Sequence, residues 1–404
     1  MRRAVLSRNL RLLGVNNVAV SDLLTWVTKS SRALCKRDVV RSRRMGSVMA
    51  NPQPGAAAQE TGCARAARRR SWPPAAARRC GKDVMVQSGR ALLAAVVLLA
   101  QGAGYGAERE SRDDAWWTGP LLAPSAASLP QGHALIEPYV FDVVTTGSID
   151  RSGAHHSAPA DQEIGSLTYL LYGLTDRLTL GMIPRFFYQD PAGAPNSSGV
   201  GVGDLTLQAG YGLTRYQEGS YLPALALVVD ETLPTGRYDR LARASDGVGA
   251  GTYATGLSVY SQDYFWMPNG RILRARLDFT YTLSSSVNVQ GASVYATPEG
   301  FYGRAYPGDG VTVDAAAEYS MTRNWVLAMD VVYQYNANTH LRGSAPGVAV
   351  VEADSGSSYS LGFAPGIEYN WSARAGALLG VRIISIGHNI ATTVTPALAV
   401  NLVF

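Results

Sequence analysis

The C-terminal two thirds of the chain consists of segments of about 12 to 15 residues in which apolar and polar side chains alternate. The clearest is 272–283, ILRARLDFTYTL, with Leu277 and Phe279 on one face and Arg276 and Asp278 on the other. A period of two is typical of a β-strand whose two faces meet different surroundings. No apolar run reaches the roughly 20 residues of a membrane-spanning helix. The pattern therefore predicts an all-β fold.

Twelve such segments follow one another, separated by clusters of Gly, Asp, Asn, Pro and Ser. We expect strands near 133–146, 161–174, 176–187, 202–216, 221–234, 249–262, 270–283, 309–321, 323–336, 355–370, 372–386 and 389–404. Proline cannot donate to a strand ladder, so we expect local bulges where proline falls inside these segments. These positions are Pro138, Pro184, Pro365 and Pro396. An even strand number suits a sheet that closes on itself.

Alternation alone also fits a soluble β-sandwich, which buries its apolar face against a second sheet. Two features favour a membrane barrel instead. Short turns, such as 174–176 and 322–323, alternate with long loops, such as 284–308 and 337–354. Aromatic residues gather at both sets of strand ends, as in the two girdles of a membrane barrel. They are Tyr172, Tyr211, Tyr221, Tyr319, Trp325, Tyr369 and Trp371 near the turns, and Phe187, Tyr188, Tyr281, Tyr333 and Tyr335 near the loops. The sequence predicts a membrane-spanning, up-and-down antiparallel β-barrel of about 12 strands over 132–404, with both termini in the periplasm.

A secretory signal peptide precedes the barrel. Residues 85–107, MVQSGRALLAAVVLLAQGAGYGA, combine a methionine, one arginine, an apolar run of about ten residues and small residues. This run is too short to span a bilayer. We therefore expect export, with the mature chain starting near residue 108 and residues 108–131 forming a periplasmic extension. The sequence leaves open whether this extension hangs in the periplasm or folds into the lumen.

Residues 1–84 differ from the rest in composition. They carry 18 Lys or Arg against four acids, a net charge of +14, so residues 85–404 carry −9 within a chain total of +5. The basic pI is therefore an average over two unlike pieces, and it does not indicate nucleic-acid binding. We interpret 1–84 as upstream translation before a true start at Met85, with a disordered basic extension as the alternative. All three cysteines lie in this segment.

Four motifs resemble a known family. They are YGLTDRLTLGMIPRF (172–186), GVGDLTLQAGYGL (201–213), PALALVVDETLPTGRYD (223–239) and GTYATGLSVY (251–260). In this order and spacing they resemble the outer-membrane family named for the meta pathway of phenol degradation. The resemblance covers the barrel alone and implies a transporter linked to the breakdown of aromatic compounds, without assigned catalytic residues. It also implies the outer membrane of a Gram-negative bacterium.

The C-terminus resembles the signal that the barrel-assembly machinery recognises. Leu398, Val400, Leu402 and Phe404 alternate up to a terminal aromatic residue, although Ala399 stands where glycine is usual. This resemblance implies that the assembly machinery is a partner, together with outer-membrane lipid and a small-molecule solute.

The polar face of the strands predicts the lumen lining. The charged residues expected there are Arg274, Arg276, Asp278, Asp314, Glu318, Asp330, Glu368, Arg374, Arg382 and Asp204. Leu135, Tyr139, Phe141 and Tyr260 are expected to add apolar patches. Charges of both signs on neighbouring strands can pair as a structural lattice. Alternatively, they can form a constriction that selects solutes by charge.

The function that this pattern favours is a channel for small molecules, and the family resemblance implies that these are aromatic or otherwise hydrophobic. We expect no cofactor or metal. A structural or adhesive barrel is the alternative, and a lipid hydrolase is a further one. A hydrolase needs a nucleophile and a base within hydrogen-bond reach. The candidates are His155 or His156 with Ser152 or Ser157, in a flexible Gly/Ala/Pro loop with nothing to orient them. We therefore expect no enzyme activity.

Overall fold

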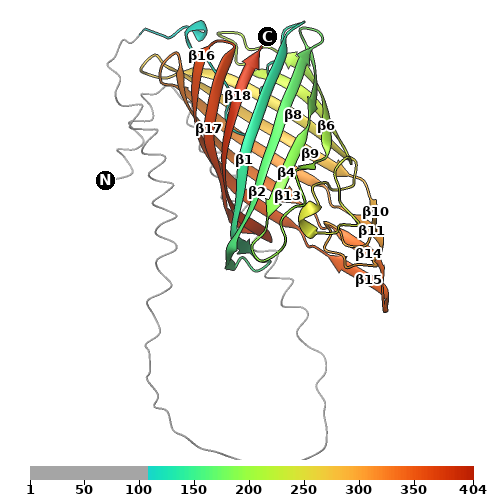
Figure 1. Cartoon of the computed structure of the whole chain (residues 1–404). Helices are drawn as coiled ribbons and strands as arrows, with labels where there is room; N and C mark the ends of the chain where they lie inside the picture. Colours follow the sequence, from blue (N-terminus) through green and yellow to red (C-terminus); the bar gives the residue numbers. More distant parts are fainter. Residues whose placement is uncertain (1–107) are drawn as a thin grey trace, which may run out of the picture. The chain divides into compact units, whose positions relative to one another are not determined.

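The computed structural model describes residues 108–404, so the predictions for the basic segment and the signal peptide lie outside the described residues. The described chain forms one antiparallel ring of strands (Figure 1). Its strands are β1 (Ala134–Ile149), β2 (His155–Gly173), β3 (Leu178–Ile183) continued by β4 (Arg185–Asp190), β5 (Gly201–Val202) continued by β6 (Leu205–Thr214), β7 (Ala224–Leu233), β8 (Ala254–Trp266), β9 (Ile272–Ser284), β12 (Gly310–Ser320), β13 (Trp325–Asn336), β16 (Ser358–Ser372), β17 (Ala375–His388) and β18 (Ile390–Val403).

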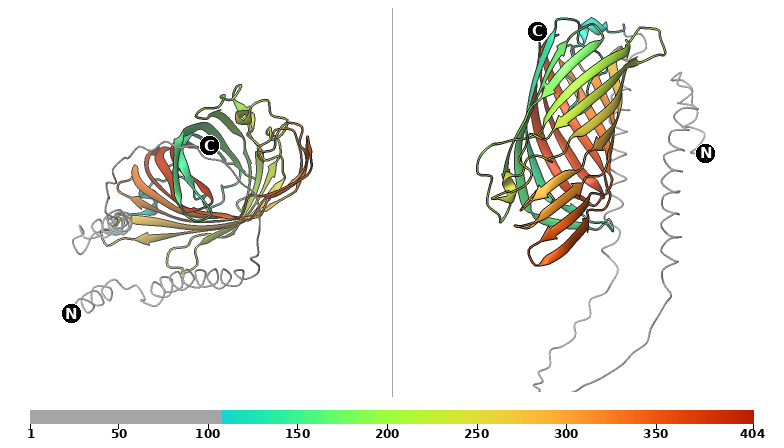
Figure 2. Two further views of the ribbon diagram at one scale, coloured as in Figure 1. Left: turned by 90° about the horizontal axis from the view of Figure 1, so that it is seen from below. Right: turned by 90° about the vertical axis from the view of Figure 1, so that its right-hand side faces the viewer.

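The ring closes through β1. Leu135 pairs with Leu171 of β2 on one side and with Val403 of β18 on the other. Counting β3/β4 and β5/β6 as one strand each, the ring has twelve strands. The view from below shows that these strands enclose a lumen (Figure 2). The predicted all-β, twelve-stranded antiparallel barrel is confirmed.

Of the four prolines inside strands, Pro184 alone interrupts its strand, where it separates β3 from β4. Pro138, Pro365 and Pro396 keep their places in the ladders, opposite Thr168, Met329 and Val381. The register shifts of β1 and β16 lie elsewhere, at Thr145/Gly147 in β1 and at Leu361/Gly362 and Asn370/Ser372 in β16. The expected bulge at each proline is therefore wrong for three of the four positions.

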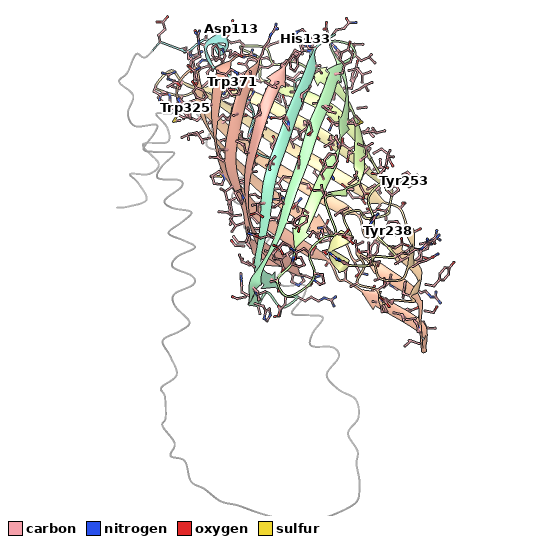
Figure 3. The ribbon with its side chains drawn as sticks, in the orientation of Figure 1. Asp113, His133, Tyr238, Tyr253, Trp325 and Trp371 are labelled. Atoms are coloured by element: carbon pink, nitrogen blue, oxygen red, sulfur yellow. The ribbon has the colours of Figure 1, made fainter. Side chains whose placement is uncertain are left out.

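The two ends of the barrel differ. The short turns and the C-terminus lie at one end, which we call the turn end, and the long connections lie at the other, the loop end (Figure 1). Trp325 and Trp371 mark the turn end in Figure 3, while Tyr238 and Tyr253 lie toward the loop end. Here, part of the expected loops folds into a second sheet of β10 (Val287–Gln290), β11 (Tyr302–Tyr306), β14 (His340–Ala345) and β15 (Val348–Asp354). This small sheet was not predicted.

The faces of the barrel are arranged as in a membrane protein. Outward residues are apolar and exposed, for example Leu277 at 57% and Leu398 at 49%, whereas inward residues such as Asp330 are buried. A soluble sandwich would bury the apolar face, so this distribution is that of an outer-membrane β-barrel. Among residues 108–404, no helix is both long and apolar enough to cross a bilayer.

Candidate functional site: the barrel lumen

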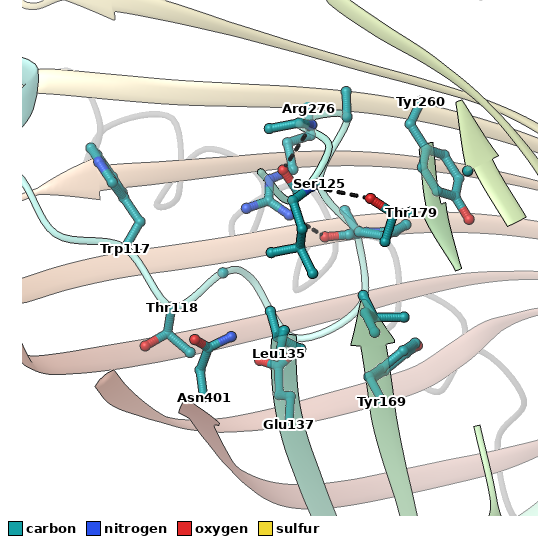
Figure 4. A pocket seen from close by; sticks show the side chains of 18 of the residues that line it. Trp117, Thr118, Ser125, Leu135, Glu137, Tyr169, Thr179, Tyr260, Arg276 and Asn401 are labelled. Carbon is teal, nitrogen blue, oxygen red and sulfur yellow. Dashed lines mark hydrogen bonds between the residues drawn. The ribbon is translucent and has the colours of Figure 1, made fainter. Parts of the chain in front are cut away.

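Residues 115–131 run through the lumen, and we call them the lumen loop. The loop begins at the turn end, where the Trp116 N–H donates to the Arg323 carbonyl at 3.1 Å. Its middle lies deep inside the barrel, with Leu121 and Ala123 buried. It then returns to the turn end, where the Gly132 N–H bonds to the carbonyl of Gly173, and enters β1 (Figure 4). The structure thus places within the lumen a segment whose location the sequence left open.

The tip of the lumen loop is held by two charged side chains through its backbone. Asp330 accepts hydrogen bonds from the backbone N–H groups of Leu121 (3.0 Å), Leu122 (3.3 Å) and Ala123 (3.0 Å). Arg276 Nη1 donates to the carbonyl oxygen of Ala123 at 2.6 Å. Hydrogen bonds to ionised groups are stronger than those between neutral groups, so these four hydrogen bonds fix the position of the tip.

A second carboxylate binds residues 118 and 119, which lead from the turn end to the tip of the lumen loop and which we call its descending part. Glu368 Oε2 accepts the N–H groups of Thr118 (2.7 Å) and Gly119 (3.2 Å). The Thr118 hydroxyl donates to Asn370 Oδ1 at 2.8 Å. Glu368 and Asn370 both project inward from β16, so one strand carries this part of the loop.

Arginines and an acid on β9 and β12 form the ion-pair core of the lumen wall. Arg274 binds Glu318 through two nitrogens, with Nε donating to Oε2 at 2.7 Å. Arg276 Nε lies 3.1 Å from the same oxygen, without the geometry of a hydrogen bond. Arg274 also stacks over Trp117, 4.7 Å from the ring centroid. Because Arg274, Arg276 and Glu318 are all buried, removing the Glu318 carboxylate would leave two buried guanidinium groups without their shared counter-charge.

Glycines make room for the lumen loop. A Cβ on Gly376 would overlap the Thr118 hydroxyl, and one on Gly173 would overlap the carbonyl of Pro130. These close approaches require glycine on the inner face of β17 and at the end of β2.

The remaining predicted lumen residues fall into three groups. Asp278 and Asp314 face each other across β9 and β12, and both are buried. Arg382 is partly buried on β17, and its Nη2 donates to Gln334 Oε1 at 2.6 Å. Asp204 lies at the break between β5 and β6, where it accepts the N–H groups of Gly236 and Ala250 and so anchors a loop.

Arg374 does not lie where the sequence predicted. It occupies the exposed turn before Ala375, the first residue of β17, so its side chain is not on the inner face of a strand. The predicted strand 372–386 begins too early. Since β16 continues to Ser372, the turn lies at 373–374 and β17 begins only after it.

Two cavities adjoin the lumen loop. The turn-side cavity, about 290 Å³, lies between the loop and the inner face of β1, β2 and β8 (Figure 4). The loop-side cavity, about 350 Å³, lies beyond the tip of the loop, against β1, β2, β17 and β18. Tyr139 and Tyr169 line both cavities, and their rings pack edge to face at 5.9 Å. The cavities therefore share one aromatic boundary.

The lumen has two chemically different walls. The strands β9, β12, β13 and β16 carry the charged groups that hold the loop, and we call them the charged wall. The opposite side, formed by β1, β2 and β18, presents mainly Leu135, Tyr139, Phe141 and Tyr169, and we call it the apolar wall although Glu137 and Asn401 also project from it into the turn-side cavity. Leu135 and Tyr260, expected to face inward, line the turn-side cavity, and Phe141 lines the loop-side cavity.

A family match decides the classification of this barrel. Residues 144–383, more than half of the chain, match the family described as the "MetA-pathway of phenol degradation". The chain belongs to this family. The resemblance in the four motifs is thereby confirmed. None of the curated proteins compared with the chain matches it.

Solved structures agree on the fold of this phenol-degradation family member. An outer membrane channel from Pseudomonas putida F1 superposes with a TM-score of 0.55 at 18% identity, covering 70% of this chain and 100% of the channel. The toluene transporter TbuX from Ralstonia pickettii is 11% identical, with a TM-score of 0.35 over 74% of this chain and 98% of its own. The first match shows a shared outer-membrane barrel fold, and the second is too distant to support an argument.

The most important groups that sequence reasoning missed in this family member are backbone amides. The N–H groups of the lumen loop bind Asp330 and Glu368, yet an amide carries no residue signature. Tyr169 was also missed as a lining residue, because β2 does not alternate cleanly. The composition of the loop could have indicated its location in the lumen. Leu121 and Leu122 are surrounded by the small residues Ala, Pro and Ser, so the segment has a small cross-section that fits inside a barrel.

The histidine and serine candidates lie at the loop end of the β1–β2 hairpin. His155, His156 and Ser157 are the first residues of β2 and pair with β1, which corrects the predicted loop, and Ser152 lies in the turn before them. His156 Nε2 lies 2.8 Å from Asp150 Oδ2, and the Ser152 hydroxyl donates to Asp150 at 2.7 Å instead of to a histidine. These bonds, with the N–H of Ala154, hold the pKa of Asp150 well below its usual range. No group of three or more His, Cys, Asp or Glu within 108–404 is arranged to hold a metal ion.

Proposed function

We propose that the barrel passes small aromatic or hydrophobic molecules across the outer membrane, along its apolar wall. The observation that carries this proposal is the pair of cavities that share Tyr139 and Tyr169 and flank the tip of the lumen loop. Apolar pockets of about 300–1,000 Å³ with a few polar groups are typical of small-molecule sites.

The two walls have different roles in this proposal: the charged wall binds the lumen loop, and the apolar wall contacts the solute. The charged wall binds the backbone of the lumen loop through Asp330, Glu368 and Arg276, so the loop's polar groups are satisfied away from the apolar wall. A solute on the apolar wall meets aromatic and aliphatic side chains in both cavities, together with the charged groups Glu137 in the turn-side cavity and Arg382 in the loop-side cavity. Between the cavities, Leu121 lines both, so a small displacement of the tip would join them.

Uptake into proteoliposomes tests this proposal. Liposomes with the folded barrel should take up radiolabelled benzyl alcohol and phenol faster than protein-free liposomes. A variant with Leu121 and Leu122 both replaced by Gln should lower this rate, since it places polar groups in both cavities. The matched control replaces the exposed Val350 by Gln on the small sheet, outside the barrel. Equal rates with and without the barrel would refute the proposal.

The paired charges of the lumen wall predict weak ion selectivity. Arg274 and Arg276 share the carboxylate of Glu318, and Asp330 and Glu368 add further acids to the same wall, so charges of both signs lie close together. A planar-bilayer recording should therefore give a reversal potential near zero in a salt gradient, whereas strong preference for one sign would contradict balanced pairing.

An adhesive barrel remains the second candidate, because the small sheet presents exposed side chains at the loop end. Tyr302 is 66% exposed and Tyr306 is 44% exposed on the outer face of this sheet. Replacing 287–306 and 340–354 by short Gly/Ser turns tests this alternative. The adhesive alternative expects loss of binding to cells with uptake unchanged, whereas the channel proposal expects the reverse, changed uptake without loss of binding to cells.

We further propose that the chain is exported from a start at Met85 and is assembled through its C-terminal strand. The exposed terminal residue Phe404, whose N–H donates to the Ala134 carbonyl at the β1–β18 seam, supports this proposal. Expression from Met85 should yield an outer-membrane protein whose mobility on a gel changes upon boiling. Deletion of Phe404 should lower the folded fraction severalfold.

A further inference from the structure

The loop-side cavity has the shape and lining of a binding site for one small molecule. Its walls are Tyr139, Phe141, Leu167 and Tyr169 from β1 and β2, with Leu121 and Leu122 of the lumen loop. Its volume of about 350 Å³ is roughly twice that of the ~150 Å³ apolar cavity that accepts benzene. A single ring with one substituent therefore fits.

One charged side chain lines this cavity. Within the described range 108–404, Arg382 is the sole charged residue among the lining residues. Its Nη2 is occupied by Gln334, but its Nε is buried without a hydrogen-bond partner among the described residues. The acids whose charge acts on this guanidinium, Asp314 and Asp330, take no part with it in any ion pair of that range.

Two strands border Arg382 on β17. On β16, a Cβ at Gly362 would lie in ordinary contact, 3.6 Å, with Arg382 Nε, so this nitrogen packs close to the β16 backbone. On β18, Thr395 pairs with Arg382, and Thr393 lies two residues away on the same face. Both threonines line the cavity and can donate a hydroxyl hydrogen.

We propose that the loop-side cavity binds a small apolar carboxylate monoanion, with its apolar body against Tyr139 and Phe141 and its carboxylate on Arg382. The Arg382 guanidinium donates to one carboxylate oxygen, and the hydroxyls of Thr393 and Thr395 serve the other. A neutral molecule of the same shape leaves the positive charge of Arg382 without an anionic partner in the cavity, which a site built for a charged group penalises strongly. This inference deepens the proposed function and rests on it for its role in transport.

Equilibrium dialysis of the folded barrel in detergent tests the site without requiring transport. The probes are benzoate and benzyl alcohol, which share a ring and differ in charge. The wild type should bind benzoate at least tenfold more tightly than benzyl alcohol. Arg382→Gln should reduce this ratio to near one, Arg382→Lys should give an intermediate ratio, and Thr395→Val should reduce it about threefold. Arg342→Gln, on the small sheet, is the matched control and should leave the ratio unchanged.

A change in gel mobility upon boiling first establishes that each variant is folded. If the Arg382 variants do not fold, the binding ratio of Thr395→Val tests the inference. Equal binding of the two probes by the wild type would overturn the inference, as would an unchanged ratio in the folded Arg382 or Thr395 variants. Failure of the proposed function is a separate result: preferential benzoate binding without uptake into liposomes would keep the site and reject the channel.

Discussion

The carboxylate of Asp330 on β13 accepts the backbone N–H of Ala123 at 3.0 Å, and it accepts the two preceding N–H groups of the lumen loop as well. One side chain of the barrel wall thus fixes the innermost point of a segment that enters from the turn end. The contact involves the backbone of the loop, so it depends on the wall residue more than on the loop's side chains.

Asp330→Asn should therefore loosen the lumen loop. The amide retains one acceptor oxygen and loses the charge, and each hydrogen bond to an ionised group contributes about 1.5–3 kcal/mol. We expect at least a twofold rise in mean single-channel conductance, because the tip spends more time away from the charged wall. Planar-bilayer recording measures this change. Glu352→Gln on the small sheet is the control, and a conductance distribution identical to wild type would show that Asp330 does not hold the loop.

Glu318→Gln should destabilise the whole barrel. The substitution leaves Arg274 and Arg276 buried without their counter-charge, which costs about 3–5 kcal/mol. The temperature at which the folded band disappears from an unboiled gel should fall by roughly 10 °C. Arg342→Gln removes the exposed pair with Glu352, worth at most about 1 kcal/mol, and should shift this temperature little. Equal shifts in the two variants would contradict the assignment.

The wall of the barrel was predictable from the sequence because lipid and lumen impose opposite preferences on neighbouring residues. In β9, Leu277 faces out and Arg276 faces in, and the same alternation places Glu318 and Asp330 inside. The prediction that Arg374 faces the lumen fails because alternation holds only within a strand, and this residue lies in a turn.

The lumen loop and the small sheet were not predictable, for different reasons. The loop is bound through its backbone, and its site is assembled from β9, β13 and β16, which are distant in sequence. The small sheet has strands of four to seven residues separated by Gly-rich connections, so its pattern resembles an ordinary long loop. Its core, around Val289 and Phe301, forms only when both loops are brought together.

The turn at Asp150 should open only in strong acid. Its folded pKa is held below the ordinary value near 3.9 by bonds from His156, Ser152 and Ala154. The stabilisation is therefore fully present above about pH 4 and is lost as pH falls through the folded pKa. Amide hydrogen exchange at 150–157 should be slow at pH 7 and pH 5. Asp150→Asn should speed it at both values, and if exchange in this variant matches wild type at pH 7, the carboxylate does not hold the turn.

Gly376→Ala should displace the descending part of the lumen loop while leaving the barrel folded. The added Cβ overlaps the Thr118 hydroxyl and the Asn370 amide, so the hydrogen bond between these two residues cannot form. Residues 108–404 contain no cysteine, so Ser125→Cys provides a single reporter in the loop. Its thiol should react with a water-soluble maleimide several times faster in the Gly376→Ala background. Gly199→Ala is the matched control, because its Cβ would meet nothing within 4 Å. A rate raised equally by both substitutions would attribute the effect to general loosening of the barrel and not to the contact between β17 and the loop.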